Sequence, residues 1–177
     1  MLNGKGYGNV LRNGTLQAKG KYVIMGDSDD SYNFLDLNAF MEKLYEGYDF
    51  VIGNRYLGKM EKGAMKLTHK YIGTPTISFI GRKKYAINVG DFNCGLRAYD
   101  NEKIINLKCT STGMEYATEM LIKAVENNLK ITEVPIDFYR DGREHKSHLN
   151  TIKDGIRHFK VLAKPKKKEQ NKKGYKN

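Results

Sequence analysis

The stretch K-Y-V-I-M-G-D-S-D-D-S, from Lys21 to Ser31, decides the fold of this chain. Its apolar run, Tyr22 to Met25, has the length of a strand buried on both faces, and three carboxylates follow Gly26 within four residues. In an open α/β sheet the ligand crevice lies beyond the carboxyl ends of the strands, so Asp27 and Asp29 are expected at a substrate site. Alternating carboxylates offer two hard oxygen ligands and therefore predict a Mg²⁺ or Mn²⁺ site that holds a metal diphosphate.

The same acidic stretch has a second interpretation as a turn and helix N-cap. Short acidic and hydroxyl side chains accept hydrogen bonds from the free N–H groups of a helix, which here would open at about Asn33. An EF-hand calcium loop is excluded, because it needs glycine at its sixth position and glutamate at its twelfth, where this chain has Tyr32 and Asn38. The metal site and the helix cap both remain open at this point.

The residues that follow predict a second strand at the same rim of the sheet. Apolar residues from Phe34 to Leu44 recur at three- and four-residue steps, which predicts an amphipathic helix, and Asp49 to Gly53 predicts a buried strand. A strand, a helix and a strand of this length predict a parallel, right-handed crossover, and hence an α/β fold with a mostly parallel sheet flanked by helices. Arg55 would then share the rim with Asp27, where an arginine suits an anionic ligand.

Charged residues also occur in two apolar segments further along the chain. Asp91 and Arg97 lie within G-D-F-N-C-G-L-R-A-Y, and their burial is costly unless each has a partner or a ligand. The helix expected to begin at the capping residues Thr110 to Thr112 carries Glu115 and Glu119 near its start, where the helix dipole favours anions. A structural ion pair and a functional role fit the first pair equally, and a solvated acidic pair is the simpler interpretation of the second.

The C-terminal part of the chain is basic. The loop that contains Arg140, Arg143 and Lys146 could clamp phosphates or be an ordinary basic surface loop. A helix from about Leu149 to Ala163 is amphipathic and basic, a pattern typical of helices that lie on a membrane surface. Lys164 to Asn177 carries seven lysines and one glutamate, which predicts a disordered tail that contacts anionic lipid or nucleic acid, or has no partner at all.

The composition sets the class of protein. The 177 residues are 40% hydrophobic and 29% charged with a net charge of +11, which is typical of a globular domain with a core. We expect one domain over residues 1–163 and a tail over 164–177. The sequence has neither an apolar run long enough to span a membrane nor a signal-peptide core, so we expect a cytoplasmic protein. Cys94 and Cys109 lack ligand spacing and are expected to be small buried residues.

Six segments in order resemble the inverting family 2 glycosyltransferases, in particular the branch that is similar to dolichol-phosphate mannosyltransferase. The resemblance covers Gly4 to about Leu162. It rests on G-K-G-Y-G-N-V-L-R-N-G, K-Y-V-I-M-G-D-S-D-D-S-Y, Y-D-F-V-I-G-N-R, G-D-F-N-C-G-L-R-A-Y, T-G-M-E-Y-A-T-E-M and I-T-E-V-P-I-D-F. The resemblance implies a GT-A fold, a nucleotide-sugar donor, a divalent metal, Mg²⁺ or Mn²⁺, and a lipid-phosphate or glycan acceptor.

The resemblance also implies roles for individual residues. Asp27 and Asp29 match the Asp-x-Asp motif that holds the metal on the donor diphosphate. The catalytic acidic positions are matched by Asp91, Glu115 and Glu119. The residues that match donor- or phosphate-binding positions are Arg55, Arg97, Arg140, Arg143 and Lys146. A polyprenyl phosphate acceptor is already a nucleophilic anion, whereas a sugar hydroxyl needs a carboxylate to take its proton.

The chain departs from the family pattern at its start, because nothing before Gly4 supplies the usual first apolar strand. We therefore expect an incomplete, N-terminally truncated GT-A domain. The principal hypothesis is a glycosyltransferase that works at the cytoplasmic face of the membrane. A non-catalytic module that binds metal and diphosphate is the alternative. A nucleic-acid-binding protein is not expected, because only the net charge suggests one and no aromatic-basic motif supports it.

Overall fold

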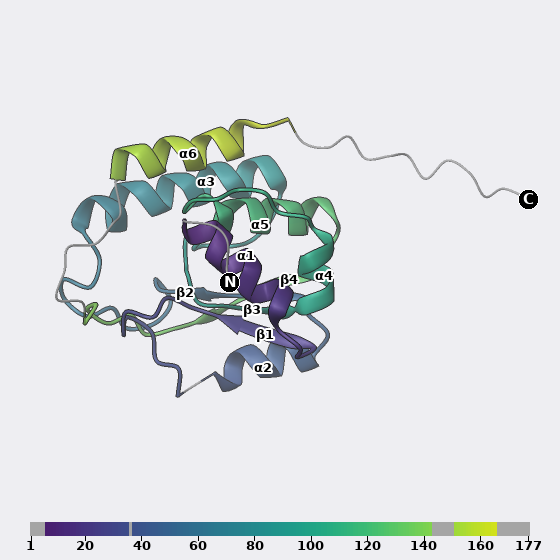
Figure 1. Ribbon diagram of the computed structural model, residues 1–177. Helices are drawn as coiled ribbons and strands as arrows, with labels where there is room; N and C mark the ends of the chain where they lie inside the picture. Colours follow the sequence, from purple (N-terminus) through teal and green to yellow (C-terminus); the bar gives the residue numbers. More distant parts are fainter. Residues whose placement is uncertain (1–5, 36, 143–150, 166–177) are drawn as a thin grey trace, which may run out of the picture.

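A four-stranded sheet forms the centre of the computed structural model, which describes residues 6–35, 37–142 and 151–165. The strands are β1 (Tyr22–Met25), β2 (Phe50–Asn54), β3 (Arg97–Asp100) and β4 (Ile131–Pro135). One face of the sheet carries α2 (Asn38–Tyr45), and the other carries α1 (Tyr7–Gln17), α3 (Thr74–Tyr85) and α5 (Tyr116–Glu126) (Figure 1). An outer helix, α6 (Thr151–Ala163), packs on α3 and α5, and the short α4 (Asn101–Asn106) follows β3. The predicted α/β fold is confirmed.

The sheet is mixed, although three of its four strands run in the same direction. β3 lies between β1 and β2 and pairs antiparallel with both, so that Val23 is opposite Tyr99 and Val51 is opposite Ala98. β2 and β4 pair in parallel. The strands of the predicted strand-helix-strand unit therefore share a direction but are not neighbours. β3 was not predictable from the sequence, because its buried Arg97 interrupts the apolar run that a central strand usually shows.

The acidic stretch after β1 does not cap a helix. α2 begins at Asn38 rather than at Asn33, and no side chain caps its first turn. The side-chain oxygen of Asn33 instead accepts a hydrogen bond of 2.9 Å from the amide of Leu35 in a local turn, which leaves Leu35 exposed. The helix-cap interpretation is therefore wrong, whereas the expected turn is present, because the backbone amide of Ser31 donates to Asp29 Oδ1 at 3.3 Å.

Helix α5 also begins later than its sequence predicts, at Tyr116 rather than near Thr110. The amides of Thr110 and Ser111 donate to the carboxylate of Glu119, at 3.0 and 2.7 Å. Because the side chain reaches back from the helix to these two amides, the residues before Tyr116 form a fixed loop rather than a helical turn.

A π-helix, η1 (His69–Gly73), leads directly into α3. Pro75 lies in the first turn of α3, a position at which proline is common in helices. Single π-helical turns are frequent at functional sites, and this one positions His69.

The core lies on both sides of the sheet. Phe40 and Leu44 of α2 fill one side, and Tyr116, Met120 and Leu121 of α5 fill the other. No helix in the described ranges is long and apolar enough to cross a membrane. The predicted lysine-rich tail lies outside the described residues from position 166 onward.

The two cysteines behave as small core residues. Both Cys94 and Cys109 are free and buried, as expected from their lack of ligand spacing. Burial raises the pKa of each thiol to about 12, so both remain protonated at neutral pH.

Candidate active site

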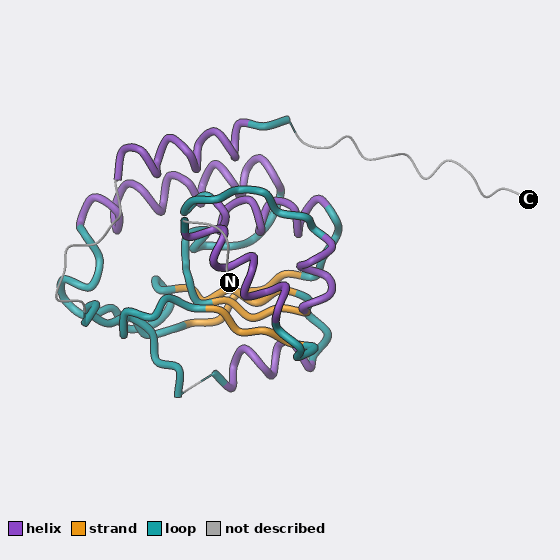
Figure 2. Tube along the Cα trace, in the orientation of Figure 1, coloured by secondary structure: helices purple, strands orange, loops and turns teal. Residues whose placement is uncertain are grey.

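The loops that follow β1, β2 and β4 gather at one end of the sheet (Figure 2) and enclose two cavities that share part of their walls. The acidic cavity is lined by Asp27, Asp29, Ser31, Tyr32, Arg55, Ala64, Met65, Lys66, His69, Asn93, Met114, Phe138 and Asp141. The apolar cavity is lined by Tyr7, Asp27, Arg55, Met65, His69, Gly73, Thr74, Ile77, Asn93, Met114, Ala117, Gly155 and His158. The carboxyl ends of strands therefore meet at one site, as the sequence predicts.

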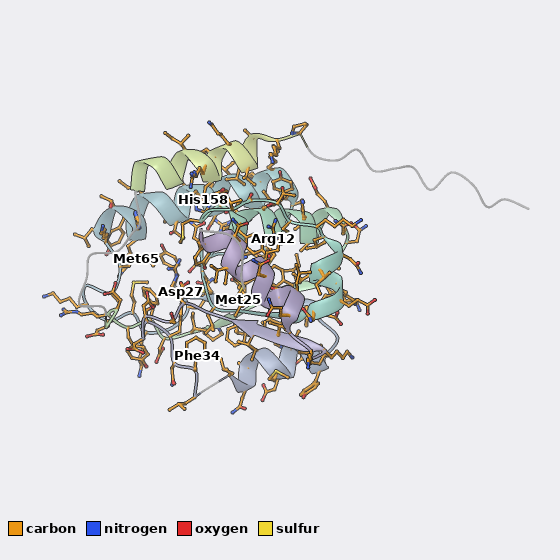
Figure 3. All side chains as sticks on the ribbon, viewed as in Figure 1. Arg12, Met25, Asp27, Phe34, Met65 and His158 are labelled. Carbon is orange, nitrogen blue, oxygen red and sulfur yellow. The ribbon has the colours of Figure 1, made fainter. Side chains whose placement is uncertain are left out.

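Asp27 lies in the wall that the two cavities share (Figure 3). Its carboxylate packs so closely on Gly95 that a Cβ at that position would come within 3.0 Å of Oδ2. Tyr7 approaches from the start of α1, and burial, followed by the neighbouring Asp27 charge, raises the pKa of its hydroxyl well above the usual value. Glycine at position 95 is thus needed for the placement of Asp27, and Tyr7 stays a neutral hydroxyl beside it.

Asp29 is held by its own loop and by the segment after β4. Its Oδ1 accepts hydrogen bonds from the amide and the hydroxyl of Ser31. Its carbonyl accepts from the amide of Gly142 at 2.9 Å, while the amide of Tyr139 donates to the carbonyl of Ser31 at 3.1 Å. Asp30 adopts a left-handed conformation with φ of 62° and is not among the described residues that line either cavity.

Arg55 and Asp91 form a buried ion pair beneath the acidic cavity. Arg55 Nε and Nη2 donate to Asp91 Oδ2 and Oδ1 at 2.6 and 2.8 Å, and the guanidinium lies 5.1 Å from the Phe138 ring centroid. Burial disfavours the charged guanidinium, but the Asp91 carboxylate outweighs that effect and holds the pKa of Arg55 well above its usual value. Arg55 lines both cavities, whereas Asp91 is fully buried and lines neither.

Arg97 does not reach the site. Its side chain is fully buried in the sheet and donates to the carbonyls of Cys94, Ala117 and Phe92 at 2.8, 2.6 and 2.9 Å. Burial lowers the pKa of its guanidinium. In this arrangement Arg97 joins the loop before β3 to α5, and Arg97 itself is not among the described residues that line either cavity.

The two glutamates expected on α5 point away from the cavities. Glu119 binds the Thr110 and Ser111 amides and lies 2.9 Å from Lys123. Glu115 accepts from the amide of Gly113 at 3.2 Å and lies 4.0 Å from Arg157 of α6. Neither glutamate is among the described residues that line the acidic or the apolar cavity.

The basic loop after β4 is described only in part. Arg140 Nε donates to the carbonyl of Lys62 at 2.7 Å and lies 3.7 Å from Glu61, and its side chain is largely exposed. The structure therefore directs Arg140 to the neighbouring loop and not into the acidic cavity. Arg143 and Lys146 lie outside the described residues.

Several residues in the cavity walls carry no signal in the sequence. His69 and Asn93 line both cavities, and His158 of α6 lines the apolar one, where its Nδ1 lies 2.7 Å from the Thr118 hydroxyl. Burial, followed by the charges of Lys66 and Arg55, lowers the pKa of His69, which favours its neutral form. Asn93 belongs to a segment already singled out for Asp91 and Arg97, but neither its spacing nor its type points to a role.

The residues of the acidic cavity fit a hard divalent cation. Asp27, Asp29 and Asp141 line one cavity, and carboxylate oxygens are the ligand type that Mg²⁺ and Mn²⁺ prefer. No cluster of three or more His, Cys, Asp or Glu side chains arranged to hold a metal occurs among the described residues. This arrangement suits an ion bound by one or two carboxylates and completed by substrate phosphates, as Mg²⁺ commonly is.

Comparison with solved structures supports the fold assignment. Glucosyl-3-phosphoglycerate synthase from Mycobacterium tuberculosis in complex with UDP superposes with a TM-score of 0.64 at 16% identity, over 89% of this chain and 54% of that one. The same enzyme with Mn²⁺, UDP-glucose and glycerol 3-phosphate gives a TM-score of 0.59 at 14% identity, over 89% and 53%. The expected GT-A fold is thereby confirmed.

Comparison with known sequences places the chain in a family. It is 32% identical over 161 residues to the low-salt glycan biosynthesis hexosyltransferase Agl6 of Haloferax volcanii, which covers 90% of this chain and 38% of the relative. It is 31% identical over 156 residues to the glycosyltransferase AglJ of the same organism, over 86% of this chain and 50% of the relative. A dolichyl-phosphate hexose transferase of that organism is 28% identical over 144 residues, over 80% of this chain and 60% of the relative.

The chain therefore spans between 38% and 60% of the length of these relatives. The family model described as glycosyl transferase family 2 matches residues 2–107, which is more than half of the chain and includes the acidic loop and the ion pair of Arg55 with Asp91. With the fold, the position of the Asp-x-Asp loop and the sequence relatives in agreement, the chain belongs to glycosyltransferase family 2.

Proposed function

We propose that the chain binds a nucleotide-diphosphate sugar through a divalent metal and transfers the sugar, with inversion, to a phosphate-bearing acceptor. The observation that carries this proposal is that Asp27 and Asp29, two residues apart at the end of β1, line one cavity with Asp141. Solved structures of similar fold contain UDP with Mg²⁺ and UDP-glucose with Mn²⁺. Asp27 and Asp29 would hold the metal, and when bound the ion would neutralise charge on the leaving diphosphate.

Fixed positive charge supports the same assignment. Arg55 lines the acidic cavity, and its geometry is set by its two hydrogen bonds to Asp91. Lys66 lines the cavity as well and can approach an anionic ligand. A charge that is held in place before the ligand binds stabilises a developing negative charge without the cost of reorganisation. We propose donor-phosphate binding for Arg55, and we keep it as a proposal for Arg143 and Lys146, which lie outside the described residues.

The positions of the expected bases favour an acceptor that is already an anion. A sugar hydroxyl needs a carboxylate within hydrogen-bonding reach to take its proton, whereas a phosphate oxygen does not. Asp91 binds Arg55 and Glu119 binds Lys123, and neither these two residues nor Glu115 is among the described residues that line the cavities. One relative is named a dolichyl-phosphate hexose transferase. We therefore propose a lipid phosphate, rather than a glycan hydroxyl, as the acceptor.

A transfer assay tests this proposal. The chain is incubated with Mn²⁺, with UDP- or GDP-sugars labelled in the sugar, and with a polyprenyl phosphate, and label is then measured in the organic phase. Mn²⁺-dependent label in the lipid fraction is expected with one donor, and Asp29→Asn should abolish it. Label that moves only to a glycan acceptor would contradict the lipid-phosphate assignment.

A second candidate function is a module that binds the metal diphosphate without turnover. It is favoured by the position of β1, which carries the acidic loop and pairs on one side only, with β3, within the described sheet. Such an open edge accepts a further strand readily. Metal-dependent binding of a nucleotide without transfer to any acceptor, restored to transfer by a second polypeptide, would favour this candidate.

We also propose a peripheral contact with the cytoplasmic face of a membrane. The outer side of α6 exposes Ile156 and Phe159, and α3 exposes Phe79, with lysines beside them such as Lys160 and Lys83. Exposed apolar side chains among cations are typical of helices that lie on anionic lipid.

Vesicle flotation tests the membrane contact. Vesicles that contain phosphatidylglycerol should bind the chain more strongly than vesicles of phosphatidylcholine alone, and the double substitution Ile156→Ser with Phe159→Ser should weaken binding. Leu16→Ser, which removes an exposed leucine from α1, is the matched control. Equal binding by the double variant and the control would contradict the assignment of this surface.

A further inference from the structure

Asn93 has a buried amide oxygen without a hydrogen-bond partner among the described residues. A buried amide group that lacks a partner costs free energy, because it has given up its hydrogen bonds to water. Native structures contain few buried polar groups without a partner, and a bound ligand that supplies the missing hydrogen bond is one explanation for such a group. The oxygen of Asn93 is therefore a candidate contact for a ligand that donates a hydrogen bond.

The backbone around Asn93 is held in place by several hydrogen bonds. The backbone amide of Asn93 donates to Asp91 Oδ1 at 3.2 Å, and Asp91 itself accepts a hydrogen bond from Arg55. One residue earlier, the amide of Phe92 donates to the Ser78 hydroxyl at 3.1 Å and its carbonyl accepts from Arg97 at 2.9 Å. The ion pair and the buried arginine thus act as the support of the loop that presents Asn93.

The position of Asn93 in the cavities narrows the class of ligand. It lines the acidic cavity with Asp27 and Asp29, and it also lines the apolar cavity. Met65 and Met114 are shared by both cavities and offer apolar surface beside it. A ligand at this point has to combine hydrogen-bond donors with apolar faces while joined to a group that Asp27 and Asp29 attract through a metal. A pyranose attached to a diphosphate has this chemistry.

We propose that Asn93 binds a hydroxyl group of the donor sugar and contributes to the choice of that sugar. The inference rests on the proposed function, because it takes the diphosphate to lie at Asp27 and Asp29. The Asn93 oxygen accepts a hydrogen bond from the hydroxyl, and the amide nitrogen can donate to a neighbouring oxygen. Sites built to hydrogen-bond a hydroxyl discriminate against ligands that lack it, because the polar group is then left buried and unpaired.

Calorimetric titration separates the sugar from the nucleotide. The full chain is titrated in the presence of Mn²⁺ with UDP, UDP-glucose, UDP-galactose, GDP and GDP-mannose, and the Kd of each nucleotide sugar is divided by that of its nucleotide. For the sugar that binds best, Asn93→Ala and Asn93→Leu are expected to raise this ratio by about tenfold, which is the effect of about one lost hydrogen bond. The Kd of the free nucleotide should change by less than about twofold.

Stability provides a second readout. Because the wild-type oxygen is buried and unpaired, the apolar side chain of Asn93→Leu should leave the melting temperature unchanged or raise it, although the sugar is bound more weakly. Asn101 is the matched control: its Oδ1 is also buried without a partner, but it lies at the start of α4 and is not among the described residues that line the cavities. Asn101→Ala should leave the ratio unchanged.

The outcomes distinguish the inference from the function on which it rests. A folded wild-type chain that binds no nucleotide with Mn²⁺ would contradict the proposed function and the inference together. Binding of a nucleotide with an unchanged ratio in both Asn93 variants would overturn the inference alone. A ratio that rises equally in Asn101→Ala would also overturn it, because the effect would then come from general destabilisation.

Discussion

The ion pair of Arg55 with Asp91 concerns stability as much as ligand binding. Asp91 is fully buried, and both of its oxygens accept hydrogen bonds from Arg55. Removal of one partner leaves the other charge buried without compensation, which commonly costs about 3 to 5 kcal/mol. Asp91 therefore fixes the position of Arg55 and of the loop that bears Asn93, without a direct contact to the cavities.

Urea denaturation of Asp91→Ala tests this role. We expect the free energy of unfolding to fall by about 3 to 5 kcal/mol, whereas Glu46→Ala, which breaks the exposed pair of Lys43 and Glu46, should leave it nearly unchanged. An Asp91→Ala chain as stable as the wild type would show that the charge is not compensated through Arg55, and that Asp91 is free for another role.

The contacts of the Glu119 carboxylate lead us to expect a specific dependence of the free energy of unfolding on pH. Burial disfavours its charged form, but the Ser111 amide and Lys123 outweigh burial and lower its pKa to about 2. A carboxyl whose pKa is lower in the folded state stabilises the fold above its unfolded value, which is 4.5 here, and that stabilisation is lost as the pH falls towards 2.

Acid unfolding of Glu119→Gln measures this contribution. Above pH 5 the variant should be less stable than the wild type by about 2 to 3 kcal/mol, and the difference should shrink as the pH falls from about 4.5 to 2. A difference that stays constant through this range would mean that the Glu119 charge does not contribute. A catalytic role for Glu119 would instead lower turnover with no change in the acid transition.

At the scale of elements, the position of α3 depends on a close contact between its Gly81 and Phe92 in the loop before β3. A Cβ added to Gly81 would come within 3.0 Å of the Phe92 ring, whereas one added to Gly14 of α1 would meet nothing within 4 Å. Alanine is the better helix former at both positions by about 1 kcal/mol. Packing should therefore decide whether alanine at position 81 stabilises or destabilises the fold, and helix propensity should decide it at position 14.

Melting temperatures of the two alanine variants check this expectation. Gly81→Ala should destabilise the chain by about 1 to 3 kcal/mol through overpacking against Phe92. Gly14→Ala should stabilise it by about 0.5 to 1 kcal/mol. A Gly81→Ala variant as stable as Gly14→Ala would contradict the close contact between Gly81 and Phe92.

Elements with a clear apolar period were predictable from sequence, and elements defined by tertiary contacts were not. β1 was predicted at its observed bounds, because four apolar residues end at Gly26. α6 was predicted within two residues of its observed start. The starts of α2 and α5 were placed too early, since Asn33 and Glu119 use their side chains to hold turns that a capping pattern does not reveal. α4 carried too short a pattern to be recognised.

At the scale of the whole molecule, the candidate site was predictable only where strand ends decide position. Asp27, Asp29 and Arg55 each follow a strand that runs in the same direction, so sequence alone was enough to bring them to one rim. Asn93 and His69 reach the cavities through a loop and a π-helix whose placement depends on long-range contacts. The family resemblance offered Arg97 and Glu119 as site residues, but neither is among the described residues that line the two cavities.

The central claim is that Asp27 and Asp29 bind a metal diphosphate, and calorimetric titration with UDP and GDP, each with and without Mn²⁺, tests it most directly. One of the nucleotides should bind only with Mn²⁺, and Asp29→Asn should weaken that binding by about tenfold or more. Asp30→Asn, a change in the same loop outside the cavities, should leave it intact. A folded chain that binds neither nucleotide, or an Asp29→Asn variant that binds as well as the wild type, would contradict the claim.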